Sequence, residues 1–144
     1  MIIIASDHAG FELKREIIKH LEETKTEFTE MGCLNGERCD YPAVAEQACR
    51  EVTEGRADKV ILVCGTGIGI SMAANKVKGI RAALCTDEYM SEYARRHNDA
   101  NALCLGGRVI GAGLACNIVD RFLSTGFEGG RHADRVNMIT KLEN

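Results

Sequence analysis

A cysteine directly before three alternating glycines is the part of this sequence with the clearest chemistry. Cys64 ends a short apolar run, and Gly65, Gly67 and Gly69 follow it before a stretch that favours a helix. Glycines let the backbone turn tightly and present its N–H groups inward, at the positive end of the following helix. Such a loop suits an anion, and a thiol at its edge favours the thiolate form. A basic sulfur beside a loop that stabilises an oxyanion suggests proton abstraction next to a carbonyl.

Two other interpretations of this segment stay open. Cysteine is among the most buried residue types, so Cys64 could equally be core filler. The glycine pattern is also partly compatible with a dinucleotide site. Ile70 stands where that fingerprint has its third glycine, but Asp87 lies about 20 residues further on, where a ribose-binding acid is expected.

Cationic side chains near the end of the chain form a candidate phosphate site. Arg131 and Arg135 stand four residues apart after two glycines, so one helical face would carry both guanidinium groups. Arg108 is a third candidate. The alternative is a surface ion pair with Asp134 or Glu128, which contributes only about 0–1 kcal/mol.

Strand and helix patterns alternate along the chain. We predict a parallel sheet covered on both faces, in an α/β/α sandwich with a Rossmann-like arrangement. A terminal helix after a complete sheet is expected to pack on a partner subunit. The predicted strands are Ile2–Ala5, Thr26–Glu30, Lys59–Val63, Arg81–Cys85 and Ala102–Leu105, and the predicted helices are Phe11–Glu23, Pro42–Glu54, Ile68–Lys76, Asp87–Arg96 and Gly113–Ser124, followed by a helix that carries Arg131 and Ile139.

The sheet must bring the candidate residues together. Ligands of such sheets bind beyond the carboxyl ends of the strands, where the strand order reverses. With an assumed flavodoxin-like order 2-1-3-4-5, the strands ending before Asp7-His8 and before Cys64 would border one crevice. His97 ends a predicted helix, where a cation stabilises the helix dipole; close to Cys64 it could act as an acid or base.

The composition narrows the class of protein. We expect a single domain over residues 1–144, with 45% hydrophobic and 27% charged residues. A net charge of -3 without a basic tract indicates no nucleic-acid or membrane-surface partner. We find no signal peptide and no apolar span, so we expect a cytoplasmic protein. Seven cysteines with no metal-ligand spacing predict a reduced protein without metal, in which the six others are apolar filler or exposed thiols.

Taken together, these segments resemble the type B ribose-5-phosphate isomerases and their sugar-phosphate isomerase family, which includes galactose-6-phosphate isomerase. The resemblance is carried by SDHAGFELK near the start, DYP at Asp40–Pro42, CGTGIGISMAANK at Cys64–Lys76, GIRAAL at Gly79–Leu84, RHNDAN at Arg96–Asn101 and EGGRHADRV at Glu128–Val136. It implies aldose–ketose isomerisation without metal or cofactor, by a homodimer, or a dimer of such dimers, with active sites at the subunit interface.

The resemblance also implies roles for individual residues. Cys64 matches the base that moves a proton between carbons 2 and 1 of the open-chain sugar, Thr66 the hydroxyl that binds the enediolate, and His97 the group that opens the furanose ring. The implied substrate-binding positions, some from the second subunit, are Asp7, His8, Tyr41, Gly65, Gly67, Ile68, Gly69, Asn98, Arg108, Arg131 and Arg135, with His132 at the edge of the pocket.

The implied reaction is the interconversion of ribose 5-phosphate and ribulose 5-phosphate. This chain carries a full set of site residues by itself, whereas the galactose-specific members work as two different subunits. A six-carbon sugar phosphate is the alternative substrate. A non-catalytic module that binds a phosphate ligand and a nicotinamide-dependent dehydrogenase are the alternatives from other classes.

Overall fold

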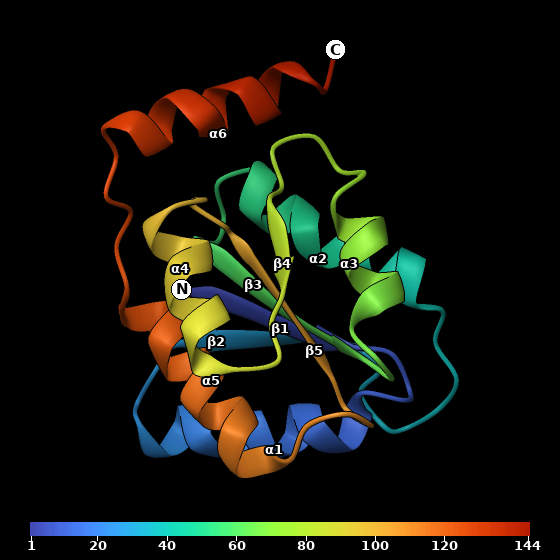
Figure 1. The fold of residues 1–144 in the computed structure, drawn as a ribbon. Coiled ribbons are helices and arrows are strands. Elements are labelled where there is room, and N and C mark those ends of the chain that lie inside the picture. Colours follow the sequence, from blue (N-terminus) through green and yellow to red (C-terminus); the bar gives the residue numbers. More distant parts are fainter.

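The computed structural model describes all 144 residues, as a five-stranded parallel sheet between helices (Figure 1). The predicted fold class is confirmed. The strands are β1 (Ile2–Ser6), β2 (Phe28–Gly32), β3 (Lys59–Cys64), β4 (Ala82–Leu84) and β5 (Ala102–Gly106), and the helices are α1 (Phe11–Glu23), α2 (Tyr41–Thr53), α3 (Ile68–Ala74), α4 (Glu88–Arg96), α5 (Ala112–Ser124) and α6 (Arg131–Lys141).

The strand order is β2-β1-β3-β5-β4, so the assumed order 2-1-3-4-5 was wrong for the last two strands. Every residue of β5 is buried, whereas the three residues of β4 are only partly buried. The more apolar and longer strand therefore occupies the interior position, and β4 takes the edge. The exchange places the loop after β5 beside the loop after β3, because Cys64 pairs with Gly106 in the register.

Two apolar cores hold the three layers together. One lies between the sheet and the layer of α1, α4 and α5, and contains Leu13, Ile17 and Phe122. The other lies under α2 and α3. Each strand alternates between them, so Cys64 points toward the face that α2 and α3 cover.

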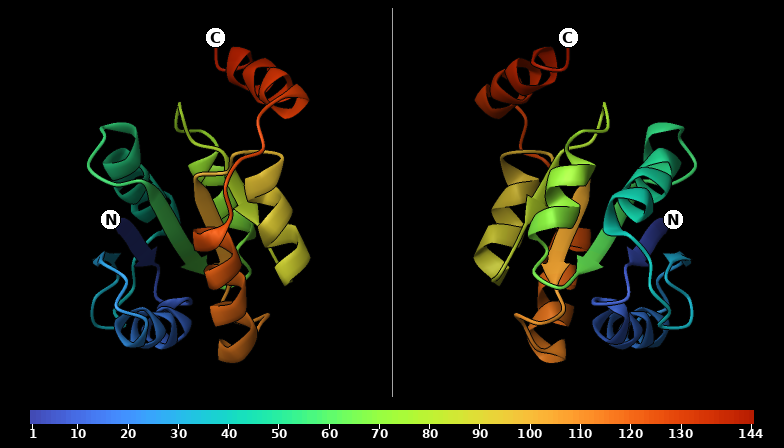
Figure 2. Two further views of the ribbon diagram at one scale, coloured as in Figure 1. Left: turned by 90° about the vertical axis from the view of Figure 1, so that its left-hand side faces the viewer. Right: turned by 90° about the vertical axis from the view of Figure 1, so that its right-hand side faces the viewer.

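The helix α6 stands apart from the layers (Figure 2). Its only buried residues are His132 and Val136. The helix lies beyond the amino end of β5, since the arrow of this strand points away from α6 (Figure 1). None of the helices has the length and apolar character needed to span a membrane.

One strand boundary differs clearly from the prediction. The second strand was expected over Thr26–Glu30 but runs from Phe28 to Gly32. The amide of Thr26 donates to the carbonyl of Leu21, and Lys25 adopts a positive φ of 56°. These residues therefore form the turn that ends α1, and β2 begins two positions later than predicted.

Candidate active site

The Cys64 thiol lies at the carboxyl end of β3, next to the amide groups of the glycine loop. The residue is 4% exposed, and its Sγ accepts a hydrogen bond from the N–H of Gly67 at 3.2 Å. The sulfur therefore has a polar contact within the loop, which core filler does not need. An N–H directed at sulfur stabilises negative charge on it.

The shape of the loop depends on Gly67. This residue has a φ of +81° and is the N-cap directly before α3. A Cβ at this position would lie 2.5 Å from Leu84 Cδ1 and 2.9 Å from the backbone carbonyl carbon of Leu105. Glycine is required here both for its backbone conformation and for the close contact with β5. The packing against β5 fixes the amide that contacts the Cys64 sulfur.

Several backbone donors of the loop remain free. The amides of Gly65, Thr66 and Gly69 donate no hydrogen bond within the chain, whereas Gly67 donates to the thiol. The N–H of Ile68 donates to Thr66 Oγ1 at 3.1 Å, which leaves the exposed threonine hydroxyl able to donate its proton. The loop can therefore offer Gly65, Thr66 and Gly69 to an oxyanion.

Residues that directly follow β1, and the first residue of α2, lie at the same end of the sheet as the loop. The Asp7 carboxylate is buried, and its Oδ1 accepts the N–H of Gly10 at 2.9 Å. His8 is exposed, and its Nδ1 lies 3.2 Å from the carbonyl oxygen of Cys39. The ring of Tyr41 packs so closely on Gly69 that a Cβ there would lie 2.7 Å from the Tyr41 Cζ.

Arg108 joins the same group because β5 neighbours β3. Its N–H donates to the carbonyl of Gly65 at 2.9 Å, and its side chain lies against Gly65. The guanidinium is exposed and forms no ion pair within the chain. We call Asp7, His8, Tyr41, Arg108 and the segment Cys64–Gly69 the carboxyl-edge site.

A second cluster lies at the opposite end of the strands, beside the amino end of β5, where α4 ends. The His97 and His132 rings stack with their centroids 3.9 Å apart and their planes at 10°. Tyr93 meets His97 edge-on, with a centroid distance of 4.8 Å. His132 is buried and His97 is partly exposed, so the pair presents His97 to solvent.

Glu128 connects this histidine pair to α4. Its Oε2 accepts a hydrogen bond from Arg96 Nε at 2.5 Å, and its Oε1 lies 3.8 Å from His97 Nε2 and 3.7 Å from His132 Nε2. The hydrogen bond from Arg96 lowers the pKa of Glu128. Burial, followed by the nearby His97 and Arg131 charges, lowers the pKa of His132. His132 is thereby favoured as a neutral ring beside His97.

The two arginines of α6 are free to bind an anion. Arg131 and Arg135 are exposed and form no ion pair, since Glu128 is paired with Arg96 instead. The alternative of a surface ion pair with Asp134 or Glu128 is therefore wrong for both arginines. We call His97, Asn98, Glu128, His132, Arg131 and Arg135 the amino-edge site.

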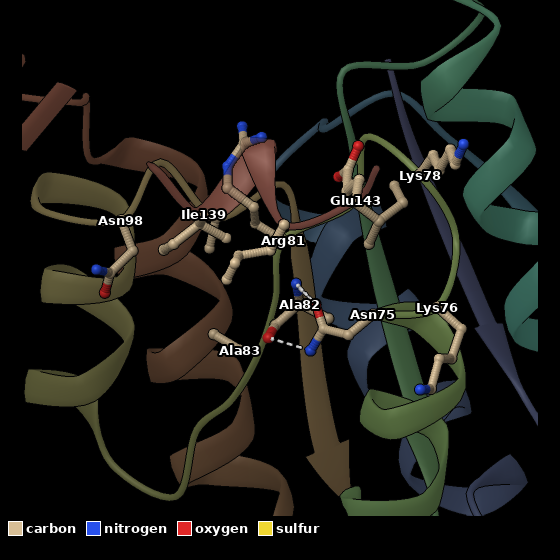
Figure 3. Close-up of a pocket in the computed structure, with 12 residues that line it drawn as sticks. Asn75, Lys76, Lys78, Arg81, Ala82, Ala83, Asn98, Ile139 and Glu143 are labelled. Atoms are coloured by element: carbon tan, nitrogen blue, oxygen red, sulfur yellow. Dashed lines mark hydrogen bonds between the residues drawn. The ribbon is translucent and has the colours of Figure 1, made fainter. Parts of the chain in front are cut away.

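A cavity of about 630 Å³ lies next to the amino-edge site, between α6, β4 and the end of α3 (Figure 3). Asn98 and Ile139 belong to its lining, together with Lys76 and Arg81. The Asn75 side chain makes two hydrogen bonds to the backbone of Ala82 there, which covers the free edge of β4. Cys64 does not line this cavity, so it is separate from the thiol.

The two sites lie at opposite ends of β5. His97 precedes this strand and Arg108 follows it. Five residues at about 3.3 Å each give a strand roughly 16 Å long. A single chain therefore does not bring His97 to Cys64, although each belongs to a well-formed group of predicted residues.

The donor sets for a metal or a dinucleotide are poor. His97, Glu128 and His132 have ligand atoms within 4.8 Å of one another. A metal lies in the plane of each imidazole that binds it, however, and two rings stacked at 10° do not share such a point. The Asp87 carboxylate accepts the N–H of Met90 as the cap of α4, so this oxygen already has a partner within the chain.

Three further cysteines are core thiols, as expected. Burial raises the pKa of Cys49 and of Cys85 to about 12, and it also raises the pKa of Cys104. The sequence pattern does not reveal that Glu128 lies beside both histidines, because it indicates only an ion pair with Arg131 or Arg135. Its position four residues before His132, on a segment leading into a helix, was the available signal.

Comparisons with known proteins agree with this architecture. Residues 2–139 match the family model described as Ribose/Galactose Isomerase. Ribose-5-phosphate isomerase B of Escherichia coli strain K12 is 49% identical over 142 residues, covering 99% of this chain and 95% of that protein. The Clostridium thermocellum ribose-5-phosphate isomerase B structure has a TM-score of 0.96 at 50% identity, covering 99% and 96% of the two chains.

A further solved structure holds a sugar phosphate. It is ribose-5-phosphate isomerase B from Mycoplasma genitalium with bound ribulose-5-phosphate, with a TM-score of 0.93 at 42% identity over 99% of this chain and 95% of that one. The family model, the curated relatives and the solved structures all cover nearly the whole chain. This chain therefore belongs to the ribose/galactose isomerase family, as its motifs indicated.

Proposed function

We propose that this protein interconverts D-ribose 5-phosphate and D-ribulose 5-phosphate, with Cys64 as the base. The observation that carries the proposal is the hydrogen bond from the Gly67 N–H to the Cys64 sulfur, beside amides that have no other acceptor. A basic atom and a set of oxyanion donors lie within one short loop. The names of the most similar relatives support the five-carbon substrate.

The proton transfer follows from this arrangement. The Cys64 thiolate removes the proton from carbon 2 of the open-chain aldose, and the electron pair moves toward the carbonyl oxygen to give an enediolate. The free amides of Gly65 and Gly69 and the hydroxyl of Thr66 hydrogen-bond that anion. One such donor contributes about 10²–10³ in rate. A proton then passes from the oxygen on carbon 2 to the oxygen on carbon 1, and the thiol returns its own proton to carbon 1, so that the carbonyl group forms at carbon 2 and the ketose results.

Ring opening and phosphate binding are assigned to the amino-edge site. His97 transfers a proton between the ring oxygen and the anomeric hydroxyl. The free guanidinium groups of Arg131 and Arg135 bind the phosphate, and this remote binding energy orients the reacting carbons. Arg108, Asn98 and His8 bind hydroxyl or phosphate oxygens around the sugar.

A homodimer would unite the two sites. Because a single chain separates them by the length of β5, we propose that the amino-edge site of one protomer faces the carboxyl-edge site of its partner. Exposed apolar side chains lie at both edges. They are Ile68 and Met72 on α3 and Met138, Ile139 and Leu142 at the C-terminal end of the chain. Burial of these side chains against the partner subunit would account for the position of α6 away from the layers. We also propose that the enzyme acts in the cytoplasm.

A comparison of three sugar phosphates as substrates tests the proposed reaction. Initial rates with ribose 5-phosphate, allose 6-phosphate and galactose 6-phosphate are measured with the purified protein. We expect the highest kcat/KM for ribose 5-phosphate. Negligible turnover of the pentose beside rapid turnover of a hexose phosphate would contradict the substrate, and binding without turnover of any sugar would favour a non-catalytic module.

Mixing two inactive variants tests the shared site. Cys64→Ala and Arg131→Ala each disable a different half of every site in their own homodimers. After random subunit exchange, half of the dimers are hybrids with one intact site, so about a quarter of the wild-type activity should return. Mixtures that stay inactive after proven exchange would contradict the proposed sharing.

A further inference from the structure

Two cysteines outside the catalytic loop lie together in the connection between β2 and α2. The Sγ of Cys33 donates to the carbonyl oxygen of Glu37 at 2.9 Å, and the Sγ of Cys39 donates to the same oxygen at 3.5 Å. The carbonyl oxygen of Glu37 therefore accepts from both thiols, which stand at the two ends of the seven-residue loop 33–39. Cys33 is buried, Cys39 is half-buried, and residues 34–38 between them are exposed.

The two thiols also affect each other electrically. Burial and the nearby Cys33 side chain raise the pKa of Cys39, and the Lys14 charge opposes this shift. Lys14 is itself buried and donates to the carbonyl of Cys33, while its Nζ lies 2.9 Å from Glu30 Oε2. Cys33 is thus anchored to the sheet, and Cys39 belongs to the more exposed side of the loop.

From this geometry we propose that Cys33 and Cys39 form an oxidation site, in which a peroxide converts the dithiol to an intramolecular disulfide. The Cys39 thiol first loses its proton, a step that its raised pKa makes slow at neutral pH, and the thiolate sulfur attacks one peroxide oxygen. The O–O bond breaks, and the second oxygen leaves as hydroxide, which takes up that proton. The Cys33 sulfur then attacks the resulting sulfenic acid, an S–S bond forms, and the S–O bond breaks to release water. The two thiols lose two electrons in total, and hydrogen peroxide is reduced to two molecules of water.

The exposed loop makes the closure mechanically feasible. A disulfide needs its two Cβ atoms about 4 Å apart with a specific dihedral angle. Residues 34–38 form no strand or helix, and Gly36 has a positive φ of 83°, where an added Cβ would meet only the Phe11 ring within 4 Å. The loop can therefore adjust while Lys14 keeps Cys33 in place.

The disulfide would reach the carboxyl-edge site through Cys39. The backbone of this residue contacts the His8 Nδ1 through its carbonyl oxygen at 3.2 Å and its amide nitrogen at 3.3 Å, and Tyr41 follows two residues later. We expect oxidation to raise KM for the sugar phosphate, because the disulfide would displace His8 and Tyr41. This expectation rests on the proposed function. Reduction by dithiothreitol should reverse this increase.

Peptide mapping tests the proposal without an activity assay. The wild-type protein is treated with hydrogen peroxide, remaining thiols are blocked, and trypsin is added without reductant. Trypsin cuts after Arg38, so the disulfide would join peptide 26–38 to peptide 39–50, and reduction would separate them. We expect this joined pair in wild type and in Cys116→Ser, which lacks another half-buried thiol, and its loss in Cys39→Ser.

The remaining outcomes have defined meanings. A joined pair that persists in Cys39→Ser would implicate Cys49, which shares peptide 39–50, and would overturn the proposal. Sulfinic acid at Cys39 without the joined pair, or a disulfide between chains, would also overturn it. If peroxide lowers kcat equally in wild type and in Cys39→Ser, the loss of activity is caused by oxidation of Cys64. In that case the proposed function stands, and the map alone decides on the dithiol.

Discussion

Replacing Gly67 by alanine should destabilise the protein through two separable effects. The φ of +81° places the new side chain in the left-handed region, which costs about 1–2 kcal/mol. The added Cβ would also lie 2.9 Å from the backbone carbon of Leu105, which has no freedom to withdraw, so overpacking adds about 1–3 kcal/mol. We therefore expect Gly67→Ala to lower the free energy of unfolding by about 2–5 kcal/mol.

Gly55 provides a matched control for this substitution. It has nearly the same φ, +80°, but a Cβ there would meet nothing within 4 Å. Gly55→Ala should cost only the backbone strain, about 1–2 kcal/mol. Urea denaturation of wild type and both variants gives the midpoints and slopes from which the free energies of unfolding are calculated.

The comparison has a clear contrary result. If Gly67→Ala loses no more stability than Gly55→Ala, the glycine loop is not packed on β5 as described. The position assigned to the Gly67 amide, and with it the contact to the Cys64 sulfur, would then be wrong. If the packing is as described, kcat of Gly67→Ala should also fall, because any shift of the loop weakens that hydrogen bond.

Two further predictions concern stability. Ser6 is fully buried and its hydroxyl has no hydrogen-bond partner, so Ser6→Ala should leave the free energy of unfolding unchanged or raise it by up to about 2 kcal/mol; a loss above about 1 kcal/mol in urea denaturation would mean that the hydroxyl is bonded. Because the pKa of His132 is lowered in the folded state, the unfolded chain takes up its proton first as pH falls, so stability should decrease below about pH 6.5 and level off below the folded-state pKa. His132→Asn should lack this decrease in melting temperature, and an identical pH profile would contradict the assignment.

The sequence predicted helices best where one face is continuously apolar. The spacing of Leu13, Ile17 and Leu21 predicted α1 with both of its ends correct, because that face packs on a single side of the sheet. The order of the last two strands was not predictable in the same way. Ala102–Leu105 and Arg81–Cys85 have similar apolar patterns, and only their packing shows which one is fully buried.

The candidate site was predictable in its parts but not in its arrangement. Short-range patterns placed Cys64 in a turn before a helix, since the glycines and the strand are adjacent in sequence. The stack of His97 on His132 joins residues far apart in the chain, and no local pattern indicates it. The shared acceptor of Cys33 and Cys39 depends in the same way on how one loop folds.

Exchange of solvent deuterium into the sugar tests the role of the Cys64 sulfur most directly. Ribose 5-phosphate is incubated with enzyme in deuterated water, and deuterium at the carbon-bound positions is followed by NMR. Wild type should incorporate deuterium, and Cys64→Ala should lose about 10²–10⁴ of that rate while it still binds phosphate, since a positioned base contributes this much. Exchange by Cys64→Ala at the wild-type rate would contradict the account.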